Sequence, residues 1–269
     1  MEEDRRLRVV IRGAGDVGSA VAHRLFCAGH AVAIHESAEP SATRRGMAFA
    51  DAVFDGHAEL EGVRALRSDQ LRDLSSLLVA REAIPVVIAD LSEALEIVRP
   101  EVLVDARMRK RATPEAQLSL APLTIGLGPG FVASETTDVV VETSWEALGR
   151  VITSGSALPL AGEPRPIAGI GRDRYVYAPV SGVFRTLLRI GDRVQRDDIV
   201  ARIESAALLA PFAGVIRGLT RDGVSVSVST EGIEIDPRSE APVIRGIAER
   251  PARIADGVVN AIQTWMKSR

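Results

Sequence analysis

Hydrophobic residues in the first half of the chain follow two alternating patterns. Short runs rich in β-branched residues, such as Leu7–Arg12 and Ala31–His35, are typical of strands buried in a parallel sheet. Between them the apolar residues of Val17–Leu25 recur at helical spacing, and Gly29 follows as a stop. A strand, a helix and a second strand joined by short connections predict a βαβ unit with parallel strands.

The same alternation continues to about residue 160. We expect a hairpin between Val53–Phe54 and His57–Leu66, with its turn at Asp55–Gly56, and then a helix capped by Ser68. A further helix is expected at Ser92–Arg99. The remaining strands are predicted at Pro85–Ile88, Val102–Val104, Leu123–Ile125 and Val139–Val141. This order predicts an α/β fold: a Rossmann-like, open, mainly parallel sheet over residues 1–160.

The second half begins differently, because residues 161–174 are rich in glycine and proline and read as a linker. Beyond it, Ala178–Val194 aligns without gaps on Ala210–Val226, with nine of the seventeen paired positions identical. Two copies of so short a strand–turn–strand unit predict a small pseudo-symmetric all-β domain over residues 175–237. Residues 238–269 form a C-terminal segment, in which Glu249–Trp265 resumes helical periodicity.

Composition narrows the classes of function. The net charge of −3 in 269 residues gives no electrostatic footprint for nucleic acid or an anionic membrane surface. No apolar run approaches the roughly 20 residues that span a bilayer. The single cysteine, Cys27, excludes an internal disulfide and fits the cytoplasm. With only four histidines and one cysteine at unpaired spacings, we expect no metal site.

A glycine-rich segment, Gly13–Gly18, follows the first strand and opens the first helix. Its glycines, Gly13, Gly15 and Gly18, have the spacing of a dinucleotide-binding fingerprint, in which backbone N–H groups and the helix dipole hold a pyrophosphate. Glu36 ends the second strand, where such folds bind the ribose hydroxyls. The alternative is a turn of the same shape that binds no nucleotide. Arg44 and Arg45 could hold a 2′-phosphate or another anion, or be a solvated pair.

Further candidate residues follow the later strands. In an open parallel sheet the ligand crevice lies at the carboxyl ends of the strands, so these segments should share one rim. We expect Asp105 and Lys110 there, in a run with four cations that could clamp an anion. A second glycine loop contributes Gly126, Gly128 and Gly130, and Glu142 follows the next strand. That loop is similar to the S-adenosylmethionine loop of tetrapyrrole methyltransferases, but its five residues favour a tight connection between strands.

With these residues, the chain resembles the accessory-protein family of the selenium-dependent molybdenum hydroxylase system. The segments that carry the resemblance are Pro40–Arg45, Ala48–Val53, Val104–Ala106, Lys110–Arg111, Ile125–Phe131 and Val140–Thr143. The resemblance implies a role in maturing the cofactor of a molybdenum hydroxylase, which would be the client protein. One departure is Ser144–Glu146, where the family has Arg-Gly-His. It puts an activity that depends on that histidine in doubt.

The repeat domain is similar to barrel-sandwich hammerheads of the biotinyl and lipoyl type. In those domains an exposed hairpin carries a modified lysine, and the corresponding hairpin here is Ile203–Leu208. It contains no lysine, so we expect neither biotin nor lipoate at this position.

Three functions therefore remain open from the sequence. The first is a maturation factor that binds a nucleotide or a molybdopterin-type dinucleotide in the α/β crevice and docks a molybdenum hydroxylase. The second is an NAD(P)-dependent oxidoreductase, for which His35 and Lys110 are the candidate acid–base groups. The third is a binding or docking module without catalysis. No catalytic residue is assigned.

Overall fold

The computed structural model describes residues 6–109, 113–159, 164–238, 240 and 242–269. The chain divides into two compact units by the contacts within each. Unit 1 consists of Met1–Ala38, Ala48–Ala161 and Ile247–Arg269, and unit 2 of Glu39–Met47 and Gly162–Gly246. Among the described residues no helix is both long enough and apolar enough to cross a membrane.

Unit 1 is built on a nine-stranded, mostly parallel sheet, which confirms the predicted α/β class. In spatial order its strands are β10 (Val151–Ile152), β9 (Val139–Val141), β7 (Leu123–Leu127), β6 (Val102–Asp105), β1 (Arg8–Arg12), β2 (Ala31–His35), β5 (Ile84–Val87), β4 (Val63–Ser68) and β3 (His57–Leu60). Only the two edge strands, β10 and β3, pair antiparallel. Strands β2 to β5 all lie on one side of β1, and the chain then crosses to β6 on the other side. The strand order therefore reverses between β1 and β6.

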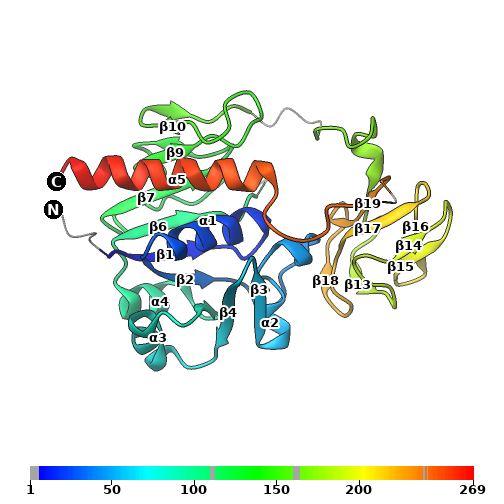
Figure 1. Cartoon of the computed structure of the whole chain (residues 1–269), viewed down its shortest axis with the longest axis horizontal. Coiled ribbons are helices and arrows are strands. Elements are labelled where there is room, and N and C mark those ends of the chain that lie inside the picture. Colours follow the sequence, from blue (N-terminus) through cyan, green and yellow to red (C-terminus); the bar gives the residue numbers. More distant parts are fainter. Residues whose placement is uncertain (1–5, 110–112, 160–163, 239, 241) are drawn as a thin grey trace. The chain divides into compact units, whose positions relative to one another are not determined.

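Helices cover the sheet. Figure 1 shows α1 (Asp16–Cys27) and the C-terminal helix α5 (Glu249–Lys267) side by side against it, and the two helices contact each other closely. A separate apolar cluster joins α3 (Leu74–Ala80) and α4 (Leu91–Val98) to the sheet residues Val10, Ala33 and Leu103. Val9 and Ile11, which flank Val10 and therefore face the opposite side of the sheet, are also buried. The continuous burial of β1 is what its unbroken apolar run predicts.

Unit 1 also contains α2 (Ala52–Asp55), a 3₁₀ turn η2 (Leu71–Asp73) and a small sheet of β8 (Val132–Ala133) and β11 (Gly155–Ser156).

The hairpin predicted between Val53–Phe54 and His57–Leu66 does not form, because Val53 and Phe54 lie in α2 and the stretch predicted as one strand itself folds into a hairpin. Strands β3 and β4 are joined at Glu61 and Gly62, which have φ values of 46° and 80°, as a two-residue hairpin turn requires. Asp55 instead ends α2, and Gly56 caps that helix in the left-handed conformation. Ser68, expected as a helix cap, is the last residue of β4. A local Asp-Gly signal fits a helix end as well as a hairpin.

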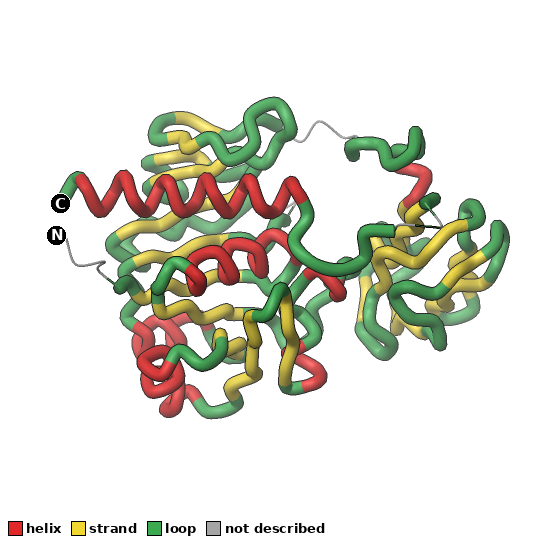
Figure 2. Tube along the Cα trace, viewed as in Figure 1, coloured by secondary structure: helices red, strands yellow, loops and turns green. Residues whose placement is uncertain are grey.

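Unit 2 consists of two four-stranded antiparallel sheets. One contains β12 (Tyr175–Tyr177), β19 (Glu231–Asp236), β17 (Gly214–Leu219) and β14 (Arg193–Val194), and the other β16 (Ala206–Leu209), β15 (Ile199–Ile203), β13 (Gly182–Arg185) and β18 (Ser225–Val226). Its helical parts are two short 3₁₀ turns, η1 (Arg45–Met47) and η3 (Arg172–Arg174). In Figure 2 the remainder of the described unit is strand and loop.

The two sheets are related by the internal repeat. Gly182 pairs with Val226, and Gly214, the residue aligned with Gly182, pairs with Val194, which is aligned with Val226. The outer strands repeat the relation, because the pair Tyr177–Glu231 corresponds to the pair Leu209–Ile199. Each copy therefore completes the sheet of the other, and aligned residues differ by 32 in number. The pairing is that of a pseudo-twofold axis.

A segment from the first half of the chain belongs to unit 2. We call Glu39–Met47 the strap. The N–H of Leu219 donates to the carbonyl of Thr43 at 2.8 Å, and Nε of Arg45 donates to the carbonyl of Leu219 at 2.9 Å. The strap therefore lies against the end of β17. Arg44 and Arg45, which the sequence offered as contacts for a 2′-phosphate or another anion, belong to unit 2 instead.

Arg44 reaches a buried carboxylate. Its Nε donates to Glu234, which is fully buried, at 2.7 Å, and Arg174 and Arg217 donate to the same carboxylate at 2.9 and 3.3 Å. Burial alone would raise the pKa of Glu234, but the three guanidinium groups outweigh it and hold the pKa below its usual range. Burial likewise raises the pKa of Tyr175, whose hydroxyl accepts from Arg44 and Arg174, to about 12.

We expect Arg44→Met to lower the free energy of opening of unit 2 by about 2 kcal/mol, because it removes charged hydrogen bonds to Glu234 and Tyr175. Two arginines, Arg174 and Arg217, still neutralise Glu234. Hydrogen–deuterium exchange of amides in β17 and β19 measures this. The control is Arg189→Met, an exposed arginine of the same unit, which should leave exchange unchanged. Equal protection in both variants would show that the strap does not hold the sheet.

Candidate functional site

The glycine turn (Gly13–Gly18) is held together by its own packing. Gly13 has a φ of 109° and lies so near the backbone of Ala106 that a Cβ would come within 3.1 Å of it. A Cβ on Gly18 would lie 2.0 Å from the carbonyl oxygen of Gly13. Gly15 differs, because nothing lies within 4 Å of the position of its Cβ. Two glycines are therefore required by the fold, and Gly15 marks the open side of the turn.

Carboxylates of the chain already occupy N–H groups of this turn. Glu36 accepts from the N–H of Ala14 at 2.7 Å and from the N–H of Ser37 at 2.7 Å. Asp16 accepts from the N–H of Val17 at 2.9 Å. Two donors expected to hold a pyrophosphate are thus satisfied internally, and Glu36 braces the turn in the structure.

Asp105 ends β6, directly beside the end of β1. It is 1% exposed and accepts from Gln117 at 2.6 Å, from Nε of Arg107 at 3.0 Å and from Arg12 at 3.5 Å. Burial opposes ionisation, but the hydrogen bonds and charge of Arg107, together with Arg12, hold its pKa below the usual range. Asp105 is a buried anchor that positions two arginines.

Arg12, the last residue of β1, carries a donor without an acceptor. Its Nη2 pairs with Glu115 at 2.8 Å, and its side chain is 7% exposed. Within the part of the chain that the structure describes, its buried Nε has no hydrogen-bond partner. Burial lowers the pKa of Arg12 against the opposing pull of Asp105. An unsatisfied buried guanidinium donor is costly in a finished fold and marks a place where an acceptor is missing.

His35 ends β2 next to Glu36. Its Nε2 lies 2.8 Å from the carbonyl oxygen of Ala89, and a carbonyl can only accept, so Nε2 carries the proton. Burial lowers the pKa of His35, and the charges of Arg12 and Arg107 add to this effect. The imidazole is therefore held neutral, with the proton on Nε2 and the unprotonated nitrogen at Nδ1.

The second glycine loop is closed by packing. A Cβ on Gly126 would lie 2.3 Å from the ring of Phe131, and one on Gly128 would lie 2.6 Å from Oγ1 of Thr143. Gly130 has a φ of 91°, which favours glycine.

Glu142, beside this loop, is fully buried. Its carboxylate accepts from the N–H groups of Thr143, Ser144 and Leu158 at 2.7 Å each. These contacts fit the tight connection that the sequence left as an alternative.

The structure thus brings together only some of the expected residues. Gly13, Gly15, Gly18, Glu36 and Asp105 meet at the carboxyl ends of β1, β2 and β6. The second loop and Glu142 follow β7 and β9 of the same sheet. Arg44 and Arg45 lie in unit 2. Lys110 falls outside the described residues.

Sequence reasoning missed the contributions of Arg12, Glu115 and Gln117. Arg12 could have been found, because it immediately precedes the glycine turn. Glu115 and Gln117 lie in a segment without strand or helix, and no periodicity pointed to them.

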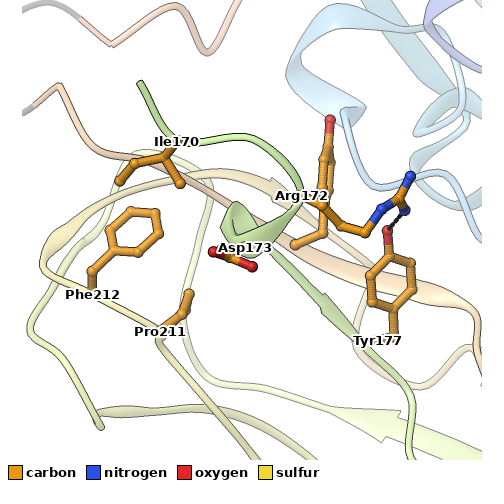
Figure 3. Close-up of a pocket in the computed structure, with 7 residues that line it drawn as sticks. Ile170, Arg172, Asp173, Tyr177, Pro211 and Phe212 are labelled. Carbon is orange, nitrogen blue, oxygen red and sulfur yellow. Dashed lines mark hydrogen bonds between the residues drawn. The ribbon is translucent and has the colours of Figure 1, made fainter. Parts of the chain in front are cut away.

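A different hollow, of about 590 Å³, lies in unit 2 (Figure 3). Ile170, Pro211 and Phe212 form its apolar part, with the carboxylate of Asp173 beside them. Tyr177 lines it farther along and accepts a hydrogen bond from Arg172 at 2.8 Å. None of the residues expected to bind a ligand lines this hollow. Among all described residues, no group of three or more His, Cys, Asp or Glu side chains is placed to hold a metal ion.

No family model matches the chain. A curated relative from Escherichia coli (strain K12), named only as the uncharacterized protein YqeB, is 37% identical over 261 residues, which is 96% of this chain and 48% of the relative. The chain therefore spans about half the length of the curated relative that it matches.

The solved structures overlap only loosely. An aspartoacylase family protein from Mesorhizobium loti is 11% identical, with 88% of this chain and 87% of that chain covered and a TM-score of 0.26. The apo ectoine utilization protein EutE from Ruegeria pomeroyi is 12% identical, with 86% of each chain covered and a TM-score of 0.26. A succinylglutamate desuccinylase/aspartoacylase from Rhodobacter sphaeroides is 14% identical over 63% of this chain and 44% of that chain, with a TM-score of 0.23. At these scores we draw no chemistry from them.

These comparisons correct the expected function. No family model matches the chain, the curated relative is uncharacterized, and none of the matched proteins is named as a maturation factor of a molybdenum hydroxylase. The predicted family, the client enzyme and the pterin-dinucleotide ligand were therefore wrong, as was the Rossmann nucleotide-binding site. The two alternative functions, an NAD(P)-dependent oxidoreductase and a binding module without catalysis, find no support in these comparisons and are set aside as well.

We expect Asp105→Asn to destabilise unit 1 by about 3 kcal/mol at pH 7, because Arg12 and Arg107 would lose their buried counter-charge. The lowered pKa of Asp105 adds stability above the unfolded pKa of about 4, and this contribution is lost as the pH falls below that value. The difference between variant and wild type should therefore shrink below pH 4. Urea unfolding followed by Trp145 and Trp265, both in unit 1, measures it.

The matched control is Asp69→Asn, whose side chain is 66% exposed. It should change stability by less than about 0.5 kcal/mol at any pH. A similar loss in both variants would contradict the anchoring role of Asp105.

Proposed function

We propose that unit 1 binds a small molecule carrying a carboxylate or phosphate group at the carboxyl ends of β1 and β6. The observation that carries the proposal is the buried Nε of Arg12, which has no acceptor among the described residues. A guanidinium group matches the planar oxygens of a carboxylate or phosphate, and its hydrogen bond to such an anion is charge-assisted. An anionic oxygen at this place would satisfy the donor.

The position in the sheet supports the same proposal. Ligands of open parallel sheets bind where the strand order reverses, and here it reverses between β1 and β6. Gly15, at the start of α1, leaves open space where a side chain would stand. Arg107, one quarter exposed and fixed by Asp105, supplies a second cation at this edge. His35, at the end of the neighbouring strand β2, is held neutral beside the same edge by burial, which lowers its pKa.

The site differs from the dinucleotide site that the sequence suggested. Glu36 and Asp16 already accept N–H groups of the glycine turn, which leaves fewer donors for a pyrophosphate. A single anionic group needs only Arg12, Arg107 and the open side of the turn. The proposal therefore names a compact ligand.

Gly15→Ala tests the site without disturbing the fold. Gly15 has a φ of −67°, which alanine adopts readily, and its Cβ would meet no atom within 4 Å. Isothermal titration with inorganic phosphate and with succinate should show binding to the wild-type chain. The variant should raise Kd about tenfold, equivalent to about 1.4 kcal/mol, because the methyl group occupies the path of approach.

The control is Arg72→Gln, a fully solvated arginine of the same unit with an 81% exposed side chain. It should leave Kd unchanged, and both variants should keep the wild-type melting temperature. The proposal would be refuted if neither phosphate nor succinate bound at concentrations up to about 10 mM. It would also be refuted if the Gly15→Ala chain bound them as tightly as the wild-type chain.

We further propose that unit 2 is a barrel-sandwich hammerhead. The reciprocal pairs Gly182–Val226 and Gly214–Val194, and the equivalence of its two four-stranded sheets, support this fold. Nuclear Overhauser contacts between the backbones of both pairs test it, and the absence of either would overturn the reciprocal arrangement. The cytoplasmic location suggested by the lone Cys27 stays a prediction.

A further inference from the structure

The pseudo-twofold axis of unit 2 allows its two halves to be compared residue by residue. Leu187 in the first copy aligns with Leu219 in the second, and the two residues are identical. Leu219 is fully buried, whereas Leu187 is 99% exposed. Arg185 and Arg217 form a second identical pair, with side chains 64% and 9% exposed. Equivalent positions therefore face different surroundings.

The strap accounts for much of the difference. It lies against the end of β17, where Leu219 donates its N–H to Thr43 and accepts from Arg45. Strand β17 continues to Leu219 on that side. In the first copy β13 ends at Arg185, and no group in the described chain pairs with the N–H of Leu187. One half thus carries an added segment, and its equivalent in the other half is uncovered.

The charge at the corresponding position is reversed. In the covered half, Glu234 of β19 receives Arg44 of the strap. The aligned residue of β15 is Arg202, which is exposed. Arg185 pairs with Arg202 across β13 and β15, so two exposed cations adjoin each other there. Arg185 also forms an ion pair with Asp222 at 3.6 Å, so Arg202 is the cation that a docked carboxylate would meet. A second segment docked in the manner of the strap would need an acidic residue where the strap has Arg44.

Exposed aliphatic residues extend the same sheet. Ile199 and Leu209 are a cross-strand pair of β15 and β16, with exposed fractions of 50% and 42%. The carbonyl of Val200, the neighbour of Ile199, accepts a hydrogen bond from the hydroxyl of Thr186, the neighbour of Leu187. This contact brings Leu187 and Ile199 to the same end of the sheet. Leu187, Ile199 and Leu209 therefore give this sheet an exposed apolar surface beside its two arginines.

We propose that this uncovered face, from Leu187 to Arg202, docks an extended acidic segment of a partner protein. The segment would accept the N–H of Leu187 through a backbone carbonyl, as Thr43 does for Leu219. Its carboxylate would pair with Arg202, in reverse of the pair that Arg44 makes with Glu234. The proposal concerns unit 2 alone and does not depend on the ligand site of unit 1.

Two synthetic nonapeptides test the proposal on the full chain by fluorescence polarisation. One has the strap sequence of residues 39–47, and the other has glutamate in place of Arg44 and Arg45. The glutamate peptide should bind at least about tenfold more tightly than the strap peptide, because it alone complements Arg202. Arg202→Glu should reverse this preference. Leu187→Ser should weaken binding of the glutamate peptide without changing the melting temperature, since Leu187 is almost fully solvated.

Val79→Ser is the control, because Val79 is 75% exposed on α3 of unit 1, and binding should be unchanged. The proposal is overturned if neither peptide binds at 1 mM (about −4 kcal/mol), or if Arg202→Glu leaves the preference as it was. Sedimentation equilibrium covers the other occupant: a dimer of the chain that Leu187→Ser dissociates would assign the face to a second copy, and would also overturn it.

Discussion

Each unit of the protein depends on one buried carboxylate surrounded by arginines. Asp105 in unit 1 orients Arg12 and Arg107, and Glu234 in unit 2 receives three guanidinium groups. An ionised carboxylate so far from water is tolerated only when it is fully paired and hydrogen-bonded. Arginine suits this task because its donors are fixed in one plane and it stays charged when buried. The chain, with only two lysines, uses arginine in both places.

At the carboxyl edge of the α/β sheet, the acidic residues mostly act inward. Glu36 braces the glycine turn, and Glu142 accepts hydrogen bonds from two N–H groups of its own loop and from the N–H of Leu158. The resulting edge is closely packed, because Cβ atoms at Gly13, Gly126 and Gly128 would meet neighbouring atoms. What this leaves for a ligand is small: the open side of Gly15 and the unsatisfied donor of Arg12. A compact anion fits that remainder better than an extended dinucleotide.

In unit 2 the strap breaks a symmetry that the repeat creates. The two copies exchange strands reciprocally, so the backbone offers two equivalent outer faces. The strap lies on one of them, and the residues beneath it differ from their counterparts, since Glu234 receives Arg44 where the other copy has Arg202. The contrast between Leu219 and Leu187 follows from this asymmetry. Aligned residues in different surroundings therefore mark the face of the repeat that the strap covers and the equivalent face that it leaves open.

The sequence by itself determined the inner strands of the α/β sheet, most of the helices and the repeat, because these arise from periodicities over a few residues. It missed the short strands β8, β10 and β11, which are too short to show a periodicity. It located the glycine turn, but it missed α2 and the hairpin of β3 and β4, because the Asp55–Gly56 signal fits a helix end as well as a turn. Only the tertiary structure decided where the charges go. Arg44 meets Glu234 across 190 residues of sequence, and Glu36 turns toward Ala14 instead of toward a ribose. Local patterns report which face of an element is buried, whereas the partner of a charged side chain depends on which distant segments the fold brings together.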